Sequence, residues 1–323
     1  MPRKIEFKTA GSPTVLQAVA FDRPRLGPGE VWLEHAAIGV NYLDVTQRSG
    51  AIPIPLPGGL GLEAAGVVAE IGEGVENVKV GDRVVYALGP IGAYADARVY
   101  PAERLIKLPD DLSFADAAAV FFKGLTAQYL IKSTYPVTRG TTILLYGAAG
   151  ALGQILAGWA NSIGARVIGV VSSSESIERA RKAGSAEVLI WNDELPRAVH
   201  DLTGRGVDVV YDGVGKMTFA ASLDSLRPRG TMVSIGASSG APDPVSPGLL
   251  NAKGSLFLTR PGLAAHIGDI DEYRERAADL FAAVSLASIT PRIWKSYPLA
   301  DVASAHADIE SRRAQGAIVL ATR

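Results

Sequence analysis

From about residue 140 to residue 260, short apolar runs alternate with longer segments in which apolar positions recur with a helical period. Such runs predict buried strands, and the segments between them predict helices. The expected strands are Ile143–Tyr146, Arg166–Val171, Glu187–Ile190, Val207–Asp212, Gly230–Ile235 and Ser255–Thr259. The expected helices are Gln154–Ile163, Ile177–Ala183, Glu194–Thr203 and Met217–Leu226. Strands and helices that alternate at this spacing indicate a parallel sheet covered on both faces, so this region is expected to be a doubly wound α/β domain.

The flanking regions have a different pattern. Up to about residue 110, short alternating runs separated by proline and glycine predict a β-rich domain, a curled antiparallel barrel. Helices are expected at Ala115–Phe121, Thr126–Thr134, Asp271–Ser285 and Asp301–Arg313, and a last strand at Gly316–Ala321. The C-terminal tail is too short for a domain and is expected to pack on the first one. The predicted domains are therefore residues 1–122 with 263–323, and residues 123–262.

Three glycines spaced three apart, Gly147, Gly150 and Gly153, follow the first strand of the middle domain. They stand before the predicted helix Gln154–Ile163, which Gly164 closes. Glycines let the backbone turn tightly and let a diphosphate approach it, and the free N–H groups at a helix start favour an anion. The pattern alone also fits a tight turn that binds nothing. Its place at the first strand of a doubly wound sheet favours nucleotide binding.

Composition narrows the class of protein. The 323 residues are 48% hydrophobic and 20% charged, which is typical of a globular protein of two domains. The net charge of −1 argues against a nucleic-acid surface. The chain has no cysteine, so disulfides, thiolate nucleophiles and cysteine-ligated zinc are excluded. No signal-peptide pattern and no membrane-spanning run is found, so a cytoplasmic protein is expected.

The order of these features resembles the medium-chain dehydrogenase/reductase superfamily, and particular strings resemble its zinc-free quinone oxidoreductase (zeta-crystallin-like) branch. These strings are Ala37–Asn41, Asp44 with Arg48–Gly50, Gly59–Gly66, Val80–Val84, Gly92–Tyr94, Lys123–Thr126, Tyr211–Gly215 and Thr259–Pro261. The resemblance implies a GroES-like catalytic domain beside a Rossmann domain. It also implies NADPH-dependent reduction of quinones or related conjugated carbonyls by a homodimer.

Zinc-dependent members of the superfamily carry a cysteine and a Gly-His-Glu triplet where this chain has Asn41–Asp44 and Gly61–Glu63. The histidines show no ligand spacing and are expected at the surface or in packing roles. They are His35, His200, His266 and His306. No metal is therefore expected, and alcohol dehydrogenation is not supported because nothing would stabilise an alkoxide.

Hydride transfer to a quinone needs placement, a dry pocket and a hydrogen-bond donor. The resemblance assigns these tasks to Asn41, which would hold the nicotinamide ribose or the substrate oxygen, and to Tyr42 and Thr46, with Ile52 also lining the pocket. For Asn41 the alternative is an ordinary turn residue at the end of a strand. The family often has tyrosine where Thr46 and Ile52 stand, so substrate size or polarity is expected to differ here.

Other polar positions are assigned structural roles. Asp44 and Arg48 stand four apart, which suits an ion pair within one helix. The segment Gly236–Gly240 fits the nucleophile-elbow pattern of serine hydrolases, but Ala241–Pro244 forbids the helix that this motif must enter. It is interpreted as a loop that faces the cofactor.

The resemblance also implies which residues hold the cofactor. Besides Asn41 they are Lys123, Thr126, Gly147, Ala149, Gly150, Ala151, Leu152, Gly153, Ser172, Ser173, Ser176, Trp191, Val214, Gly236, Ser239, Leu258 and Arg312. For Lys123 the alternative is a solvated surface charge.

The end of the second predicted strand bears on the choice between NADPH and NADH. NAD enzymes commonly place an acid there, whereas this chain has Ser172–Ser174, whose neutral hydroxyls tolerate a 2′-phosphate. The family has lysine where Ser176 stands and tyrosine where Trp191 stands, and Arg179 or Arg312 would have to compensate. NADPH is expected, with NADH as the alternative. The alternatives for the activity are reduction of the double bond of an enone or enal, and a low-turnover, crystallin-like NADPH-binding protein.

Overall fold

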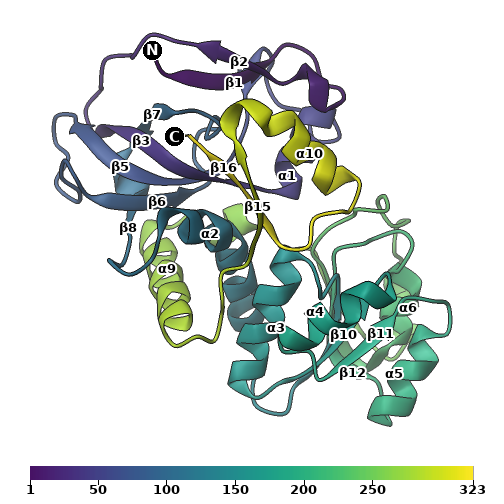
Figure 1. Ribbon diagram of the computed structural model, residues 1–323. Helices are drawn as coiled ribbons and strands as arrows, with labels where there is room; N and C mark the ends of the chain where they lie inside the picture. The colour runs from purple at the N-terminus through teal and green to yellow at the C-terminus, as the bar shows by residue number, and fades with distance from the viewer. Residues whose placement is uncertain (323) are drawn as a thin grey trace. The chain divides into compact units, whose positions relative to one another are not determined.

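The computed structural model describes residues 1–322, which form two compact units (Figure 1). Unit 1 contains residues 1–123, 273–281 and 291–322, and unit 2 contains residues 124–272 and 282–290. None of the helices in the described part of the chain combines the length and the hydropathy needed to cross a bilayer.

Unit 2 contains a six-stranded parallel sheet with the strand order β11-β10-β9-β12-β13-β14. Its strands are β9 (Thr142–Tyr146), β10 (Arg166–Val171), β11 (Glu187–Ile190), β12 (Val207–Asp212), β13 (Leu226–Ser234) and β14 (Phe257–Thr259). In chain order this is 3-2-1-4-5-6, the order of the dinucleotide-binding doubly wound fold. The expected α/β class is therefore confirmed.

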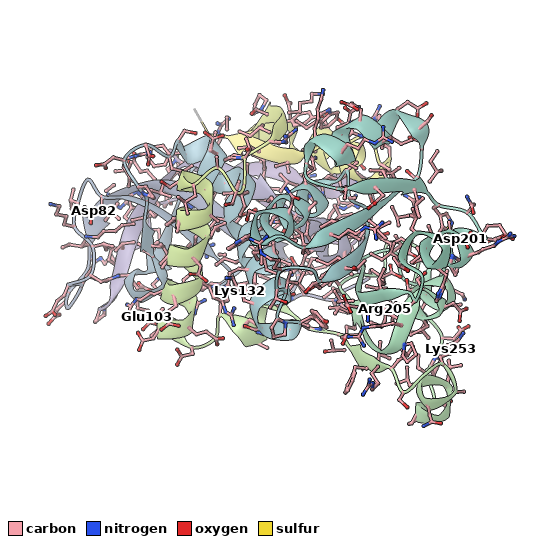
Figure 2. All side chains as sticks on the ribbon, turned by 90° about the horizontal axis from the view of Figure 1, so that it is seen from below. Asp82, Glu103, Lys132, Asp201, Arg205 and Lys253 are labelled. Atoms are coloured by element: carbon pink, nitrogen blue, oxygen red, sulfur yellow. The ribbon has the colours of Figure 1, made fainter. Side chains whose placement is uncertain are left out.

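Helices cover this sheet because its strands are apolar on both faces. The helices that contact its strands are α3 (Ala151–Ile163), α4 (Ile177–Lys182), α5 (Leu195–Thr203) and α6 (Phe219–Asp224). Two shorter helices, α7 (Pro247–Ala252) and α8 (Leu263–His266), also belong to this unit. Helices α3 and α4 contact each other, as do α5 and α6 (Figure 1). Leu144 and Ile168 of the sheet pack with Val199 of α5 and Leu223 of α6 in one buried cluster. Charged side chains such as Asp201 and Arg205 lie at the surface of this unit (Figure 2).

Unit 1 is a mainly antiparallel β domain. Its strands are β1 (Arg3–Phe7), β2 (Gln17–Ala20), β3 (Glu30–Val40), β4 (Gly58–Gly59), β5 (Glu63–Ile71), β6 (Arg83–Ala87), β7 (Ala97–Pro101), β8 (Ile106–Lys107), β15 (Ile293–Pro298) and β16 (Ala317–Ala321). The larger sheet has the order β15-β16-β3-β5-β6-β8, and β7 also pairs with β3. The C-terminal strand β16 pairs with β3, with Ile318 opposite Val40, so the tail packs on this domain.

Among the described residues four further α-helices occur, α1 (Tyr42–Ser49), α2 (Phe114–Tyr129), α9 (Ile270–Ser285) and α10 (Val302–Glu310). The expectation of two helices at 115–121 and 126–134 was wrong, because α2 runs on without a break and a π-helical turn, Leu130–Thr134, follows it. Gly124 lies inside this helix, and its cost of about 1 kcal/mol there is small beside the burial of Phe121 and Leu125 on either side.

The boundary between α6 and β13 also differs from the expectation. The predicted helix at 217–226 is shorter at both ends, and β13 begins at Leu226 rather than at Gly230. The hydroxyl of Thr218 donates to the Asp212 carboxylate, which keeps this residue outside the helix as its N-cap.

Candidate functional site

The glycine turn of unit 2 links β9 to α3. Gly147 has a φ of +66°, which favours glycine, and its carbonyl accepts from the Gly150 N–H at 2.9 Å. A Cβ on Gly153 would lie 2.2 Å from the Gly147 oxygen, so the first turn of α3 packs against the turn only without a side chain. A Cβ on Gly147 would meet no atom within 4 Å, which leaves open space beside the turn. Ala151 and Leu152, the first residues of α3, place their N–H groups at this helix start. The turn therefore fits a diphosphate.

The side chain of Arg179 ties the loop after β10 to this turn. Arg179 of α4 donates from Nε to the Ala149 carbonyl at 3.1 Å and from Nη2 to the Ser176 hydroxyl at 3.0 Å. Its guanidinium therefore spans from the glycine turn to the serine-rich loop that contains Ser172 and Ser173. A basic group here fits the 2′-phosphate of NADPH.

The other predicted cofactor residues of unit 2 follow the neighbouring strands, apart from Leu258 within β14 and Thr126 of α2. Trp191 follows β11, and its ring lies 6.0 Å from that of Tyr146. Val214 follows β12, and its carbonyl accepts from the Ser239 hydroxyl at 2.8 Å. A Cβ on Gly236, after β13, would lie 2.8 Å from the Gly213 oxygen, so these two loops touch. Because the carboxyl ends of parallel strands share one edge of the sheet, these residues border one region of unit 2.

Sequence reasoning missed the residue that shapes the loop after β12. Asp212 is fully buried, and its Oδ1 accepts from the N–H groups of Val214 and Gly215 at 2.7 and 3.1 Å. Its Oδ2 accepts from the hydroxyls of Thr218 and Ser222, each at 2.7 Å. The signal that could have identified Asp212 is an acidic residue at the end of a predicted buried strand.

In unit 1, Asn41 stands at the N-cap of α1, directly after β3, and is 5% exposed. Its Nδ2 donates to Oε1 of Glu63 at 2.8 Å. Lys123 donates to the same oxygen at 3.1 Å and is only 8% exposed, so its alternative as a solvated surface charge was wrong. Sequence reasoning used Glu63 only in the comparison with zinc enzymes and missed its contact with Asn41.

Asp44 and Arg48 do not form the expected ion pair, because each has a partner elsewhere. Asp44 Oδ2 accepts from the Asn41 N–H at 2.9 Å and from the Tyr94 hydroxyl at 2.8 Å. Arg48 pairs with Glu310 at the end of α10. Burial raises the pKa of Asp44 to about 7. Since both residues are fully buried, tertiary contacts outweigh the spacing along the helix.

The two buried histidines of unit 1, His35 and His306, stay neutral. His306 Nε2 lies 3.1 Å from the Tyr94 hydroxyl, and burial lowers the pKa of His306 to about 3. Burial likewise lowers the pKa of His35 to about 3. Among residues 1–322, no three or more His, Cys, Asp or Glu side chains are grouped so as to hold a metal ion.

The remaining site candidates of unit 1 are more exposed. Tyr42 and Ile52 are 48% and 44% exposed, so both side chains are accessible. The Thr46 hydroxyl donates to the Leu43 carbonyl within α1 at 2.7 Å, so its oxygen is already held by its own helix. Arg312 is exposed, with a φ of 58°, just after α10.

Comparison with known proteins places the chain in a family. It is 44% identical over 325 aligned residues to the quinone oxidoreductase of Salmonella typhimurium, covering 99% of both chains. The chain belongs to the quinone oxidoreductase branch of the medium-chain dehydrogenase/reductase superfamily. In agreement, residues 27–110 match the family "alcohol dehydrogenase GroES-like domain", and residues 151–283 match the family "zinc-binding dehydrogenase".

Two further relatives of this chain have names that state what they bind or reduce. The crystal structure of the Escherichia coli quinone oxidoreductase complexed with NADPH has a TM-score of 0.96 and 42% identity, with 99% of each chain covered. A 2-haloacrylate reductase from a Burkholderia species is 44% identical over 304 residues, which is 91% of each chain.

Proposed function

We propose that this chain is an NADPH-dependent quinone oxidoreductase that needs no metal. The observation that carries the proposal is its full-length similarity to quinone oxidoreductases, one of them solved with NADPH. The glycine turn supports it, because its shape and open space fit a diphosphate.

The protein's part in the reaction is binding and orientation. The N–H groups at the start of α3 would hold the diphosphate, and Arg179 would pair with the 2′-phosphate. Asn41 is proposed to hold the nicotinamide ribose or the substrate oxygen. Bound NADPH supplies the hydride, and a quinone accepts it readily because the charge delocalises onto its oxygen.

The proposal is tested by following NADPH oxidation in the presence of benzoquinones and naphthoquinones, before and after dialysis against a chelator. Steady, chelator-resistant turnover is expected. A requirement for added metal, or no turnover with any quinone, would contradict the proposal and, in the second case, favour the low-turnover NADPH-binding alternative.

The alternative activity is reduction of a conjugated carbon–carbon double bond, which the similarity to the 2-haloacrylate reductase favours. Both reactions use hydride attack on an electron-poor conjugated system, so the same site serves either. Product analysis with an enone and an unsaturated acid separates them, because only double-bond reduction gives a saturated product.

We also propose a homodimer formed through β14. This strand ends the order of the six-stranded sheet, and its Phe257 is 62% exposed. An apolar edge strand is a template for pairing with a second copy about a two-fold axis.

A further inference from the structure

The Glu63 carboxylate holds the Asn41 carboxamide inside unit 1. Three donors converge on its two oxygens: Asn41 Nδ2 at 2.8 Å and Lys123 Nζ at 3.1 Å on Oε1, and the Phe122 N–H at 2.8 Å on Oε2. Glu63 is 0% exposed, so this carboxylate is held entirely by protein groups. Three donors directed at two oxygens indicate the ionised form, which only accepts.

The backbone makes room for this carboxylate. A Cβ on Gly39 of β3 would lie 2.0 Å from Glu63 Oε1 and 2.4 Å from the Ala118 carbonyl of α2. Glycine within a strand weakens it, and often marks a close approach of other groups. Here the approaching group is the Glu63 side chain, so β3, β5 and α2 are all shaped around it.

The orientation of Asn41 follows from this contact. Because the carboxylate only accepts, the atom of Asn41 that faces it is the amide nitrogen, and a flip would set two oxygens against each other. We propose that Glu63 is a positioning residue, which fixes the plane of the Asn41 carboxamide and so places whatever that side chain binds. Lys123 compensates the buried charge. The inference rests on the proposed role of Asn41 toward the ribose or the substrate oxygen.

Stability alone explains this arrangement poorly. A buried ion pair is often no more stable than apolar side chains of the same volume. The pair shares one oxygen with Asn41, at the N-cap where β3 ends and α1 begins. A role in orientation accounts for that shared oxygen.

The test is a double-mutant cycle of Glu63→Gln with Asn41→Ala, measured as kcat/KM for a quinone. Glutamine keeps the size but has one acceptor oxygen, so it cannot satisfy the donors on both sides. Glu63→Gln is expected to lower kcat/KM by up to about 100-fold, as misplacement of a reacting group does. The double variant is expected to be no worse than Asn41→Ala alone, because Glu63 acts through Asn41.

The matched control is Glu70→Gln on the same strand β5, whose carboxylate pairs with Arg23 at the surface. It is expected to leave kcat/KM unchanged. If Glu63→Gln does not fold, Glu63→Asp carries the cycle, since it keeps the charge but withdraws the carboxylate from Asn41. Additive losses in the double variant, or a folded Glu63 variant with unchanged kcat/KM, would overturn the inference.

A second readout separates this inference from the proposed function. Wild type, Glu63→Gln, Asn41→Ala and the double variant are titrated with NADPH, and the fluorescence emission of the bound nicotinamide is recorded. In wild type the nicotinamide emission is expected to increase when NADPH binds. Loss of this increase in Glu63→Gln, with no further loss in the double variant, supports the positioning role of Glu63 even if the wild type reduces no quinone. That last result would contradict the proposed function alone, whereas unchanged emission in every Glu63 variant would contradict the positioning role.

Discussion

At the scale of single residues, Asp44 has a measurable consequence for pH dependence. It is fully buried, and burial raises its pKa from 3.8 to about 7. In the unfolded chain this acid loses its proton near pH 4, whereas the folded protein keeps it until about pH 7. The unfolded state therefore holds fewer protons between these values, and the free energy of unfolding falls as the pH rises through this window and then levels off.

Asp44→Asn removes this dependence and keeps an oxygen for the Asn41 N–H and the Tyr94 hydroxyl. We expect the stability of the variant relative to wild type to improve by about 3 kcal/mol from pH 5 to pH 8. Urea unfolding of both proteins at the two pH values measures it. The exposed Asp201→Asn serves as control, and parallel stability curves for Asp44→Asn and wild type would contradict the assignment.

How well the sequence predicts the contacts of a single residue depends on how far away along the chain its partners lie. The shape of the glycine turn was predictable because the contacts that force glycine there are local, as between Gly147 and Gly153. The partners of Asp44 and Arg48 were not, because Tyr94 and Glu310 stand far away in the chain. Glu63 was overlooked for the same reason, since its donors come from two separate segments.

At the scale of elements, alanine substitutions at the two ends of the turn, Gly147 and Gly153, are expected to have different effects on stability and on NADPH affinity. In Gly153→Ala the new Cβ would lie 2.2 Å from the backbone oxygen of Gly147, which cannot step aside, so α3 must shift. A stability loss of about 1–3 kcal/mol and a clear loss of NADPH affinity are expected. In Gly147→Ala only the positive φ is unfavourable, at about 1–2 kcal/mol, and the methyl group enters the open space proposed for the diphosphate.

Thermal unfolding and NADPH titration of both variants check this prediction. Gly147→Ala is expected to keep its fold while its NADPH affinity falls, and Gly153→Ala is expected to lose both. Gly140→Ala is the control, since it has a positive φ and open space but lies before β9. Wild-type NADPH affinity in Gly147→Ala would show that nothing binds over the turn.

The contact of α4 with the glycine turn leads to a prediction about cofactor choice. Arg179→Gln removes the charge proposed to meet the 2′-phosphate, which is worth about 1.5–3 kcal/mol, or roughly 10-fold to 100-fold in affinity. The ratio of kcat/KM for NADPH to that for NADH is expected to fall by this factor, with NADH itself little affected. Competition by 2′,5′-ADP gives an independent measure.

Arg181→Gln is the matched control, because Arg181 lies on the same short helix and is exposed. If Arg179→Gln leaves the ratio unchanged and Arg312→Gln lowers it, the phosphate contact belongs to Arg312.

At the scale of the whole molecule, the doubly wound sheet could be predicted because each strand and helix has its own local periodicity. Right-handed connections then restrict the possible strand orders, and the observed order is one that satisfies them. The β domain was less predictable, since β3 pairs with β5, β7 and β16, and the last of these stands nearly the whole chain away. Alternation along a strand shows which face is buried but not which strand lies beside it.

The proposed dimer is tested at the end of this sheet. Phe257 of β14 is 62% exposed. In the proposed dimer, a lysine at this position would bring two like charges together across the two-fold axis. In a single chain the lysine would face solvent, so the fold itself is expected to be unaffected. Wild type is expected to sediment at twice the chain mass of 33.8 kDa, and Phe257→Lys near the chain mass itself. Leu286→Lys, at a more exposed apolar residue outside the sheet, is expected to leave the mass of the wild type unchanged. A wild type that sediments as a single chain would contradict the dimer. A Phe257→Lys variant that remains a dimer would show that the interface lies elsewhere.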